Sequence, residues 1–141
     1  MPQIESNGTK ISYDDLGRGE PALILMPGWC ANRSVFADIA GRLSAHRRIL
    51  ALDWRGHGQS GPAIGDFGDD GLIDDALAVI AASGAKQIVP LALAHAGWIA
   101  IGLRKRLTNR IPKLVLLDWI IMEAPAFFLS ALEGMQMARN Y

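Results

Sequence analysis

Short apolar runs alternate with amphipathic segments along this chain, and that alternation limits the folds it can adopt more than any other feature. The runs lie within the segments 22–26, 49–52, 87–93 and 114–117, each of which we expect to be a strand. Continuous apolar runs of this kind are typical of strands buried on both faces of a sheet. Apolar residues recur at helical spacing in the segments 34–45, 72–80 and 98–107. Strands that alternate with helices predict an α/β fold with a mostly parallel sheet, right-handed crossovers and flanking helices.

Both ends of the chain depart from this alternation. Residues 3–6 and 10–13 flank Asn7-Gly8, a pair that accepts positive φ, so we expect a β-hairpin there. Residues 124–141 are apolar on more than one face. A terminal helix of this kind needs cover from other parts of a protein.

Composition and charge fit one globular domain and exclude several classes of partner. The chain has 141 residues, half of them hydrophobic and one fifth charged, with a formal net charge of zero. Because it has neither a basic stripe nor an acidic tail, we expect no nucleic-acid or membrane partner. Cys30 is the only cysteine, which excludes an intramolecular disulfide and a cysteine-based zinc site. With no apolar signal region and no stretch fit to span a membrane, we expect a cytoplasmic protein.

The carboxyl ends of the predicted strands indicate where the chemistry should lie, because ligands of parallel sheets bind outside these ends. Four segments follow the strands directly, at residues 27–31, 53–61, 93–98 and 118–122. The first holds a Pro-Gly-Trp loop, the second begins Asp-Trp-Arg-Gly-His-Gly, and the third is a turn of small residues. Candidate site residues are therefore confined to these segments.

The order of these motifs resembles the α/β-hydrolase fold, and three residue pairs carry a narrower resemblance. The pairs are Trp29-Cys30, Gly97-Trp98 and Asp118-Trp119. Together with the Asp-Trp-Arg-Gly-His-Gly loop, they are similar to the cofactor-free 2,4-dioxygenases of 3-hydroxy-4-quinolones and quinaldines. The resemblance covers roughly residues 21–128, which is most of the chain.

The resemblance implies that the chain holds only part of such a domain. We expect residues 1–123 to be the N-terminal part of the α/β-hydrolase core and residues 124–141 to begin its cap. The remainder of the domain is expected on a further segment or on a second chain, for example after proteolytic nicking; a truncated chain is the alternative. A natural stand-alone domain is disfavoured, because it would leave a sheet edge and apolar surface uncovered.

The turn at residues 92–97 takes the place of the nucleophile elbow of this fold, which needs small residues because its backbone packs closely. By alignment with G-x-S-x-G, Ala94 occupies the serine position, and Ala92 and Ala96 replace the flanking glycines. Alanine has no side-chain oxygen, so no acyl-enzyme can form. Either the native gene encodes alanine or serine was replaced in an engineered protein. The two further alanines favour the native alanine.

Two backbone N–H groups are expected to act at this turn. His95 follows the elbow position at a helix N-terminus, and Trp29 follows the first predicted parallel strand. Their N–H groups would form an oxyanion hole for charge that develops on a substrate oxygen. The alternative is that both residues only pack the loops and the core. With Ala94, Trp98 and Trp119 they make up the predicted oxyanion and substrate-binding residues, and no metal site is predicted.

Asp118 is the predicted catalytic residue of the chain. It directly follows a strand, where a carboxylate could orient a histidine; the alternative is an aspartate that caps the following turn. In the similar dioxygenases, the matching aspartate partners a catalytic histidine. Here His46 is expected to be solvated, His57 to have a structural hydrogen-bonding role and His95 to contribute its backbone. The catalytic histidine is therefore expected beyond Tyr141, since it comes last in the chain order of this fold.

The resemblance implies a cofactor-independent dioxygenase that degrades a quinolone quorum signal. The substrate would be a 2-alkyl-3-hydroxy-4(1H)-quinolone, a hydrophobic heteroaromatic molecule, and O2 would cleave its ring to an N-acylanthranilate and carbon monoxide. No cofactor is expected, because the deprotonated substrate itself activates O2, and the sequence has no ligand-spaced Cys/His cluster and no dinucleotide glycine motif. Two alternatives stay open: an esterase or amidase whose serine was mutated to alanine, and a non-enzymatic relative that binds a small hydrophobic ligand.

Four positions near the site depart from the better-known members of this family. Those members have histidine at the positions of Ala31 and Leu93, serine at the position of Ala94, and glycine at the position of Ala96. We expect a less polar pocket, which would favour a longer alkyl substituent. Phe127, Phe128 and Met135 are candidate contacts for that substituent, and core packing is the alternative role for these three residues.

Overall fold

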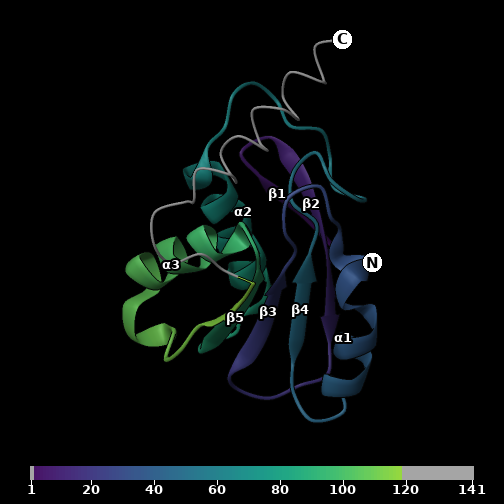
Figure 1. Cartoon of the computed structure of the whole chain (residues 1–141), viewed down its shortest axis with the longest axis vertical. Helices are drawn as coiled ribbons and strands as arrows, with labels where there is room; N and C mark the ends of the chain where they lie inside the picture. Colours follow the sequence, from purple (N-terminus) through teal and green to yellow (C-terminus); the bar gives the residue numbers. More distant parts are fainter. Residues whose placement is uncertain (1, 119–141) are drawn as a thin grey trace.

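The computed structural model describes residues 2–118, and these form one six-stranded sheet with helices on both faces (Figure 1). The strands are β1 (Gln3–Ser6), β2 (Thr9–Leu16), β3 (Ala22–Met26), β4 (Ile49–Leu52), β5 (Ile88–Leu93) and β6 (Val115–Leu117). Their order across the sheet is β1-β2-β4-β3-β5-β6. Strands β4, β3, β5 and β6 run parallel, and the β1–β2 hairpin joins β4 antiparallel. The predicted α/β fold and its N-terminal hairpin are confirmed; the expectations for residues 124–141 lie outside the described residues.

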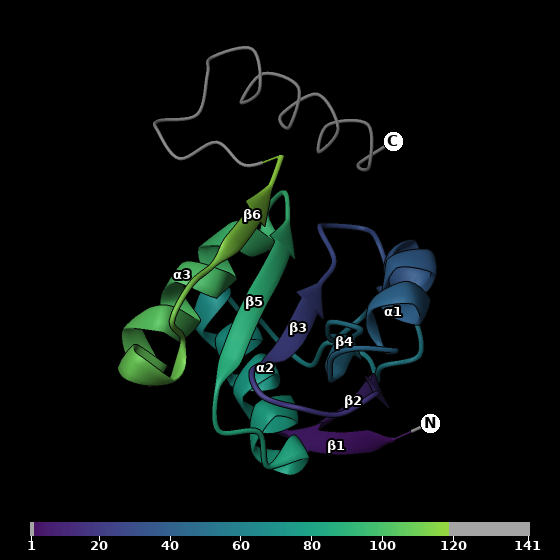
Figure 2. The same ribbon diagram turned by 90° about the horizontal axis from the view of Figure 1, so that it is seen from below.

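Within the described residues, three α-helices cover the two faces of the sheet unequally. Helices α2 (Asp69–Ser83) and α3 (Ala96–Leu107) pack side by side on one face, and α1 (Ala37–Leu43) lies on the other (Figure 2). The short 3-10 turns Arg33–Phe36 and Thr108–Arg110 precede α1 and follow α3. None of the helices in residues 2–118 combines the length and the apolar character that crossing a membrane requires.

Two helix boundaries differ from the sequence prediction. The helix predicted at residues 34–45 starts as a 3-10 turn, in which the Asn32 side chain accepts a hydrogen bond from the Ser34 N–H at 2.9 Å. A side-chain acceptor of this kind satisfies a donor that the first turn leaves unpaired. Helix α3 begins at Ala96 rather than at Trp98, because the turn after β5 is shorter than predicted.

The central strands bury side chains on both faces, as their apolar runs predict. In β3, Ile24 packs into the core beneath α2 and α3, whereas Leu23 and Leu25 pack into the core beneath α1. Strand β4 divides in the same way between Leu50 and Ile49. Neighbouring side chains of a strand point to opposite faces, so each run contributes to two cores.

The parallel strands bring four chain segments to one edge of the sheet. The loops after β3, β4 and β5, and Asp118 after β6, all leave from the carboxyl ends of parallel strands. Only Ala94 and His95 connect β5 to α3. These are the segments to which the sequence confined the candidate residues.

Candidate active site

The turn between β5 and α3 has the backbone strain of a nucleophile elbow. Ala94 has φ +52°, in the left-handed region that residues with a side chain rarely adopt. Its N–H donates to the Leu117 carbonyl oxygen on β6 at 2.9 Å, and its own carbonyl accepts from the Gly97 N–H at 3.0 Å. The turn therefore carries a methyl group where a hydrolase of this fold carries its nucleophilic oxygen.

The loop after β3 packs directly against this turn. A Cβ atom added to Gly28 would lie 3.2 Å from the Leu93 carbonyl oxygen and 3.5 Å from the Ala94 Cβ. A side chain at this position would therefore push the two loops apart. The close approach places Trp29, the next residue, beside the elbow.

Trp29 lies between two imidazole rings at this edge of the sheet. Its ring centroid is 5.9 Å from that of His57 and 6.2 Å from that of His95, and both contacts are edge-to-face. Such geometry is favourable for aromatic rings. Trp29 is nevertheless 61% exposed and Trp98, in the first turn of α3, is 48% exposed. Large aromatic side chains left open to solvent are typical of a binding surface.

The backbone N–H groups of Trp29 and His95 have no hydrogen-bond acceptor among residues 2–118. They belong to the two loops that meet at Gly28. The next N–H groups of α3 do have partners, since Gly97 donates to the Ala94 carbonyl and Trp98 donates to the His95 carbonyl at 3.2 Å. The two predicted oxyanion donors are therefore among the N–H groups left available to a ligand oxygen, and their role stays a prediction.

The three histidines have different surroundings. His57 has Nδ1 at 3.0 Å from the carbonyl oxygen two residues before it, and Nε2 accepts from the Cys30 N–H at 3.3 Å. His46 is exposed. His57 therefore makes the hydrogen bonds that its predicted structural role requires, and the solvated position predicted for His46 is confirmed. The His95 ring, by contrast, has an unpredicted neighbour: its Nε2 lies 3.7 Å from the Asp69 carboxylate at the start of α2.

Asp118 lies next to the elbow at the end of β6. Leu93 and Leu117 are paired in the sheet, so the residues that follow them, Ala94 and Asp118, leave the sheet together. Asp118 is exposed and has φ +54°. Among residues 2–118, no side chain pairs with its carboxylate. Trp119, the remaining predicted site residue, lies outside the described part of the chain.

A small apolar hollow lies beneath the exposed aromatic side chains. It holds about 10 Å³, which is room for one water molecule. Its lining includes Trp29, Trp54, His57, Phe67 and His95. A bicyclic aromatic ligand cannot enter such a space and would lie above it. The residues from 2 to 118 bring together no group of three or more His, Cys, Asp or Glu side chains that could hold a metal ion.

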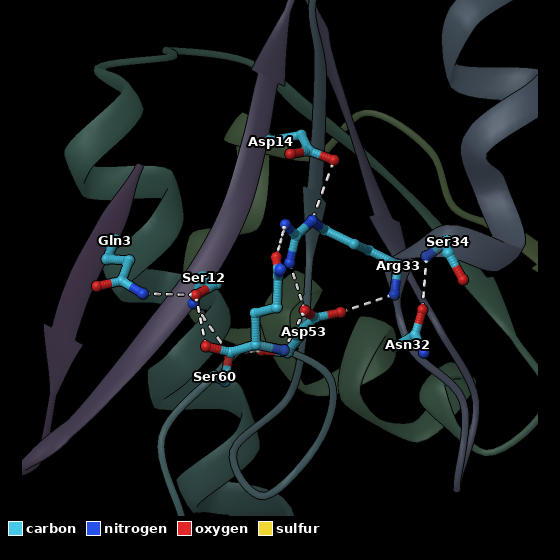
Figure 3. A network of polar contacts seen from close by, with 9 residues as sticks. Gln3, Ser12, Asp14, Asn32, Arg33, Ser34, Asp53 and Ser60 are labelled. Atoms are coloured by element: carbon cyan, nitrogen blue, oxygen red, sulfur yellow. Dashed lines mark hydrogen bonds and ion pairs between the residues drawn. The ribbon is translucent and has the colours of Figure 1, made fainter. Parts of the chain in front are cut away.

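A polar network joins the loops after β3 and β4 to each other and to β2 (Figure 3). At its centre the buried Asp53 carboxylate accepts from the backbone N–H groups of Arg33 at 2.7 Å and Gln59 at 2.9 Å, and it also pairs with the Arg33 guanidinium. That guanidinium contacts Asp14 on β2 at 3.1 Å. Ser60 Oγ donates to the Asp53 carbonyl at 2.6 Å. The network fixes the positions from which both loops start.

A buried ion pair anchors the β4 loop to α2. Arg55 donates to the Asp75 carboxylate through Nε at 2.9 Å and Nη2 at 2.6 Å, and the two side chains are 5% and 0% exposed. The hydrogen bond to Asp75 raises the pKa of the Arg55 guanidinium, although burial opposes that change. The guanidinium carbon also lies 5.5 Å from the centre of the Phe67 ring. The loop that carries Trp54 and His57 is therefore fixed to a helix.

Comparison with known proteins gives the class of protein that this fold and site define. A family model described as alpha/beta hydrolase fold matches residues 21–139. The chain therefore belongs to the α/β-hydrolase-fold family, and the broader resemblance found in the sequence is confirmed.

Similar proteins include quinolone dioxygenases, which confirms the narrower resemblance. The 2-heptyl-3-hydroxy-4-quinolone dioxygenase AqdC2 of Rhodococcus erythropolis is 34% identical over 134 residues, 92% of this chain and 50% of that protein. The 1H-3-hydroxy-4-oxoquinoline 2,4-dioxygenase of Pseudomonas putida is 32% identical over 136 residues, 95% of this chain and 52% of that protein. The structure of AqdC, solved for recognition and ring cleavage of the Pseudomonas quinolone signal, matches with a TM-score of 0.90 and 33% identity, over 96% of this chain and 52% of that one. The chain spans about half the length of these relatives.

Proposed function

We propose that the protein to which this chain belongs is a cofactor-independent dioxygenase of 2-alkyl-3-hydroxy-4(1H)-quinolones. It would cleave the ring of such a quorum signal with O2, giving an N-acylanthranilate and carbon monoxide in the cytoplasm. Relatives named as quinolone dioxygenases, at 32–35% identity, support this substrate class.

One observation carries the proposal: the elbow keeps its strained geometry without a nucleophile. Ala94 has φ +52° but no side-chain oxygen, so covalent acyl transfer has no attacking group. The donors that stabilise charge on a substrate oxygen, the N–H groups of Trp29 and His95, have no acceptor among residues 2–118. Such a site suits a reaction that passes through an oxygen anion without bonding to the protein.

The substrate ring would lie across the exposed aromatic surface. The hollow beneath it holds about 10 Å³, so the bicyclic ring would rest on its rim, against Trp29 and Trp98. Trp119 would add to this surface. One ring oxygen would then face the Trp29 and His95 N–H groups, beside the methyl group of Ala94.

Asp118 would orient a histidine that removes the proton from the substrate 3-hydroxyl group. That histidine, and the segments that enclose the substrate, would come from the remainder of the domain, on a further segment or a second chain. In this arrangement residues 1–123 supply the first part of the core and residues 124–141 the start of the cap. The exposed position of Asp118 at the end of β6 supports this role, because its carboxylate is open to an incoming side chain.

The chemistry balances without a bound cofactor. The deprotonated quinolone gives electrons to O2, and the reduced oxygen bonds to the ring carbon that carries the alkyl group. The distal oxygen then attacks the C4 carbonyl, and the cyclic intermediate breaks its O–O bond and its two ring bonds to the central carbon. That carbon leaves as carbon monoxide with the former hydroxyl oxygen. Both O2 atoms stay in the N-acylanthranilate, and the abstracted proton is returned.

Rapid mixing of the complete protein with 2-heptyl-3-hydroxy-4(1H)-quinolone tests this function. Without O2, we expect binding and deprotonation but no ring cleavage; on admission of O2, we expect carbon monoxide and the acylanthranilate in equal amounts. Ala94→Ser is the matched variant, and its dioxygenase activity should stay within a few-fold of the parent protein. Turnover that proceeds without O2, or ester cleavage with no carbon monoxide, would show a hydrolase instead.

A further inference from the structure

We propose that His57, as a neutral imidazole, is a positioning residue that holds the Trp29 N–H in place for the substrate oxygen. The proposal rests on the proposed function, because it assigns His57 a role through the oxyanion donor and not through contact with substrate. Both residues lie at the carboxyl edge of the sheet, but on different loops.

Two side chains of the β4 loop contact the β3 loop on either side of Trp29. Trp54 Nε1 donates to the Pro27 carbonyl oxygen at 2.8 Å, and His57 Nε2 accepts from the Cys30 N–H at 3.3 Å. Trp29 lies between these two contacts. A donor in a short segment that is held on both sides keeps its direction without a protein acceptor of its own.

Peptide geometry carries the constraint from Cys30 to Trp29. The peptide group that joins them is planar, so the Cys30 N–H, the Trp29 carbonyl and the Trp29 Cα move as one unit. The Trp29 N–H lies in the preceding peptide group, whose Gly28 carbonyl oxygen accepts from the Ala31 N–H at 3.3 Å. Cys30 has φ +62°, a strained value for a residue with a side chain. Such values persist only where the surroundings enforce them. The hydrogen bond to His57 is a contact that can enforce this one.

The second ring nitrogen determines which tautomer His57 adopts. Nδ1 lies 3.0 Å from the Arg55 carbonyl oxygen, which can only accept, so Nδ1 carries the proton. Nε2 is then the acceptor that the Cys30 N–H needs. An imidazolium carries hydrogens on both nitrogens and would lose the Cys30 contact. Arg55 is itself paired with the buried Asp75, so the imidazole is attached to a fixed part of the fold.

Packing alone does not hold the tip of the β3 loop. Trp29 is 61% exposed and Cys30 is exposed, so little apolar surface is buried there. The titratable groups nearby are the Cys30 thiol, together with His95 and Asp69 at the starts of α3 and α2. Within the described residues, none of these side chains hydrogen-bonds to His57. The two backbone contacts of the imidazole therefore determine its tautomer.

Three variants of the complete protein test the role. His57→Phe keeps an aromatic edge against Trp29 but removes the acceptor, whereas His57→Gln keeps a side-chain acceptor. His46→Phe changes an exposed histidine outside the site and is the matched control. The readouts are the imidazole nitrogen chemical shifts, the hydrogen-exchange rate of the Cys30 amide, and kcat and KM for the quinolone.

We expect the wild-type His57 to be neutral with its proton on Nδ1. In His57→Phe, Cys30 amide exchange should rise by about tenfold or more. Its kcat should fall by about tenfold to a hundredfold with little change in KM, which is less than the 10²–10³-fold cost of removing an oxyanion donor outright. His57→Gln should recover most of both losses, and His46→Phe should match the wild type.

The outcomes separate the two proposals. If the wild-type protein does not cleave the quinolone, the proposed function fails, while the chemical shifts and amide exchange still report on the loop contact. A proton on Nε2, or equal Cys30 exchange in the wild type and in both His57 variants, overturns the positioning role whatever the activity. A loss of kcat that His57→Gln does not restore also overturns it. Because the tautomer is measured on the wild type, a variant that fails to fold leaves that test intact.

Discussion

Two loops leave the same edge of the sheet, and they treat their polar and aromatic groups in opposite ways. The first residues of the loop after β4 bury their charges and pair them, as Asp53 does with Arg33 and Arg55 does with Asp75. The loop after β3 and the start of α3 leave Trp29 and Trp98 61% and 48% exposed. The loop after β4 is therefore a scaffold, and the exposed aromatic residues form the surface that it supports. Substitutions in the β4 loop should therefore reduce stability, and those at the exposed aromatic residues should reduce binding.

Breaking the buried ion pair should have the largest effect. Arg55→Met leaves the Asp75 carboxylate buried without a partner, which costs about 3–5 kcal/mol of unfolding free energy. Urea unfolding measures the loss. The exposed pair of Arg42 and Asp38, at 3.3 Å, is the matched control, and Arg42→Met should cost less than about 0.5 kcal/mol. Equal losses in the two variants would show that burial does not distinguish these pairs.

Gly58→Ala should be the next most damaging change. Gly58 has φ +52°, and an added Cβ would lie 2.3 Å from Asp53 Oδ2, so the carboxylate would have to leave its hydrogen bonds. We expect a loss of about 2–3 kcal/mol in the same unfolding measurement. Gly65→Ala is the control, because Gly65 has φ +68° with no atom within 4 Å of the added Cβ. It should lose only about 1 kcal/mol, and a loss as large as that of Gly58→Ala would rule out the steric explanation.

The sequence predicted the strands and helices well, because both have periodic patterns of apolar residues. The run Ala22–Met26 is a strand with the predicted bounds, and its side chains divide between the two cores. The motifs also indicated the elbow at Ala94, whose backbone has the strain that the motif implies. Local patterns were sufficient for these features, since each depends on neighbouring residues.

The pairings that hold the loops together could not be predicted from the sequence. Arg33 and Asp53, like Arg55 and Asp75, are separated by 20 residues and meet only after the sheet has formed. No local spacing links such residues, so Asp53 was identified only as the first residue after a strand. Trp54 is a similar case, because its contact with Pro27 depends on the neighbouring positions of β3 and β4.

Two tryptophans, one from each loop, should show the same difference with effects of intermediate size. Trp54 is 4% exposed and donates to the Pro27 carbonyl, so Trp54→Phe should leave that oxygen unpaired and cost about 1–3 kcal/mol. Trp29→Phe should change the unfolding free energy by less than about 0.5 kcal/mol, while it weakens quinolone binding in a fluorescence titration. If Trp29→Phe destabilises the protein as much as Trp54→Phe does, the aromatic surface is part of the scaffold.

The smallest effect is expected at an exposed carboxylate that is bonded in the same way as Asp53. Glu20 accepts hydrogen bonds from the backbone N–H groups of Lys86 and Gln87, each at 3.0 Å. These bonds lower the pKa of Glu20 below its ordinary value of 4.5. A lowered pKa in the folded state means that the carboxylate adds stability above the unfolded pKa, and that this stability is lost as the pH falls through the folded pKa.

Glu20→Gln should therefore lower the unfolding free energy at about pH 7 by only a few tenths of a kcal/mol, because solvent screens the site. The gap to the wild type should narrow as the pH falls below 4.5. Asp53→Asn is the buried counterpart and should cost several times more at about pH 7, since it removes the negative charge that pairs with the Arg33 guanidinium, which is only 12% exposed. Urea unfolding at several pH values measures both variants. If the difference in unfolding free energy between Glu20→Gln and the wild type widens in acid, the sign of the pKa change is contradicted. Equal losses of unfolding free energy at the two positions would mean that the number of hydrogen bonds, not burial, sets the contribution of a carboxylate.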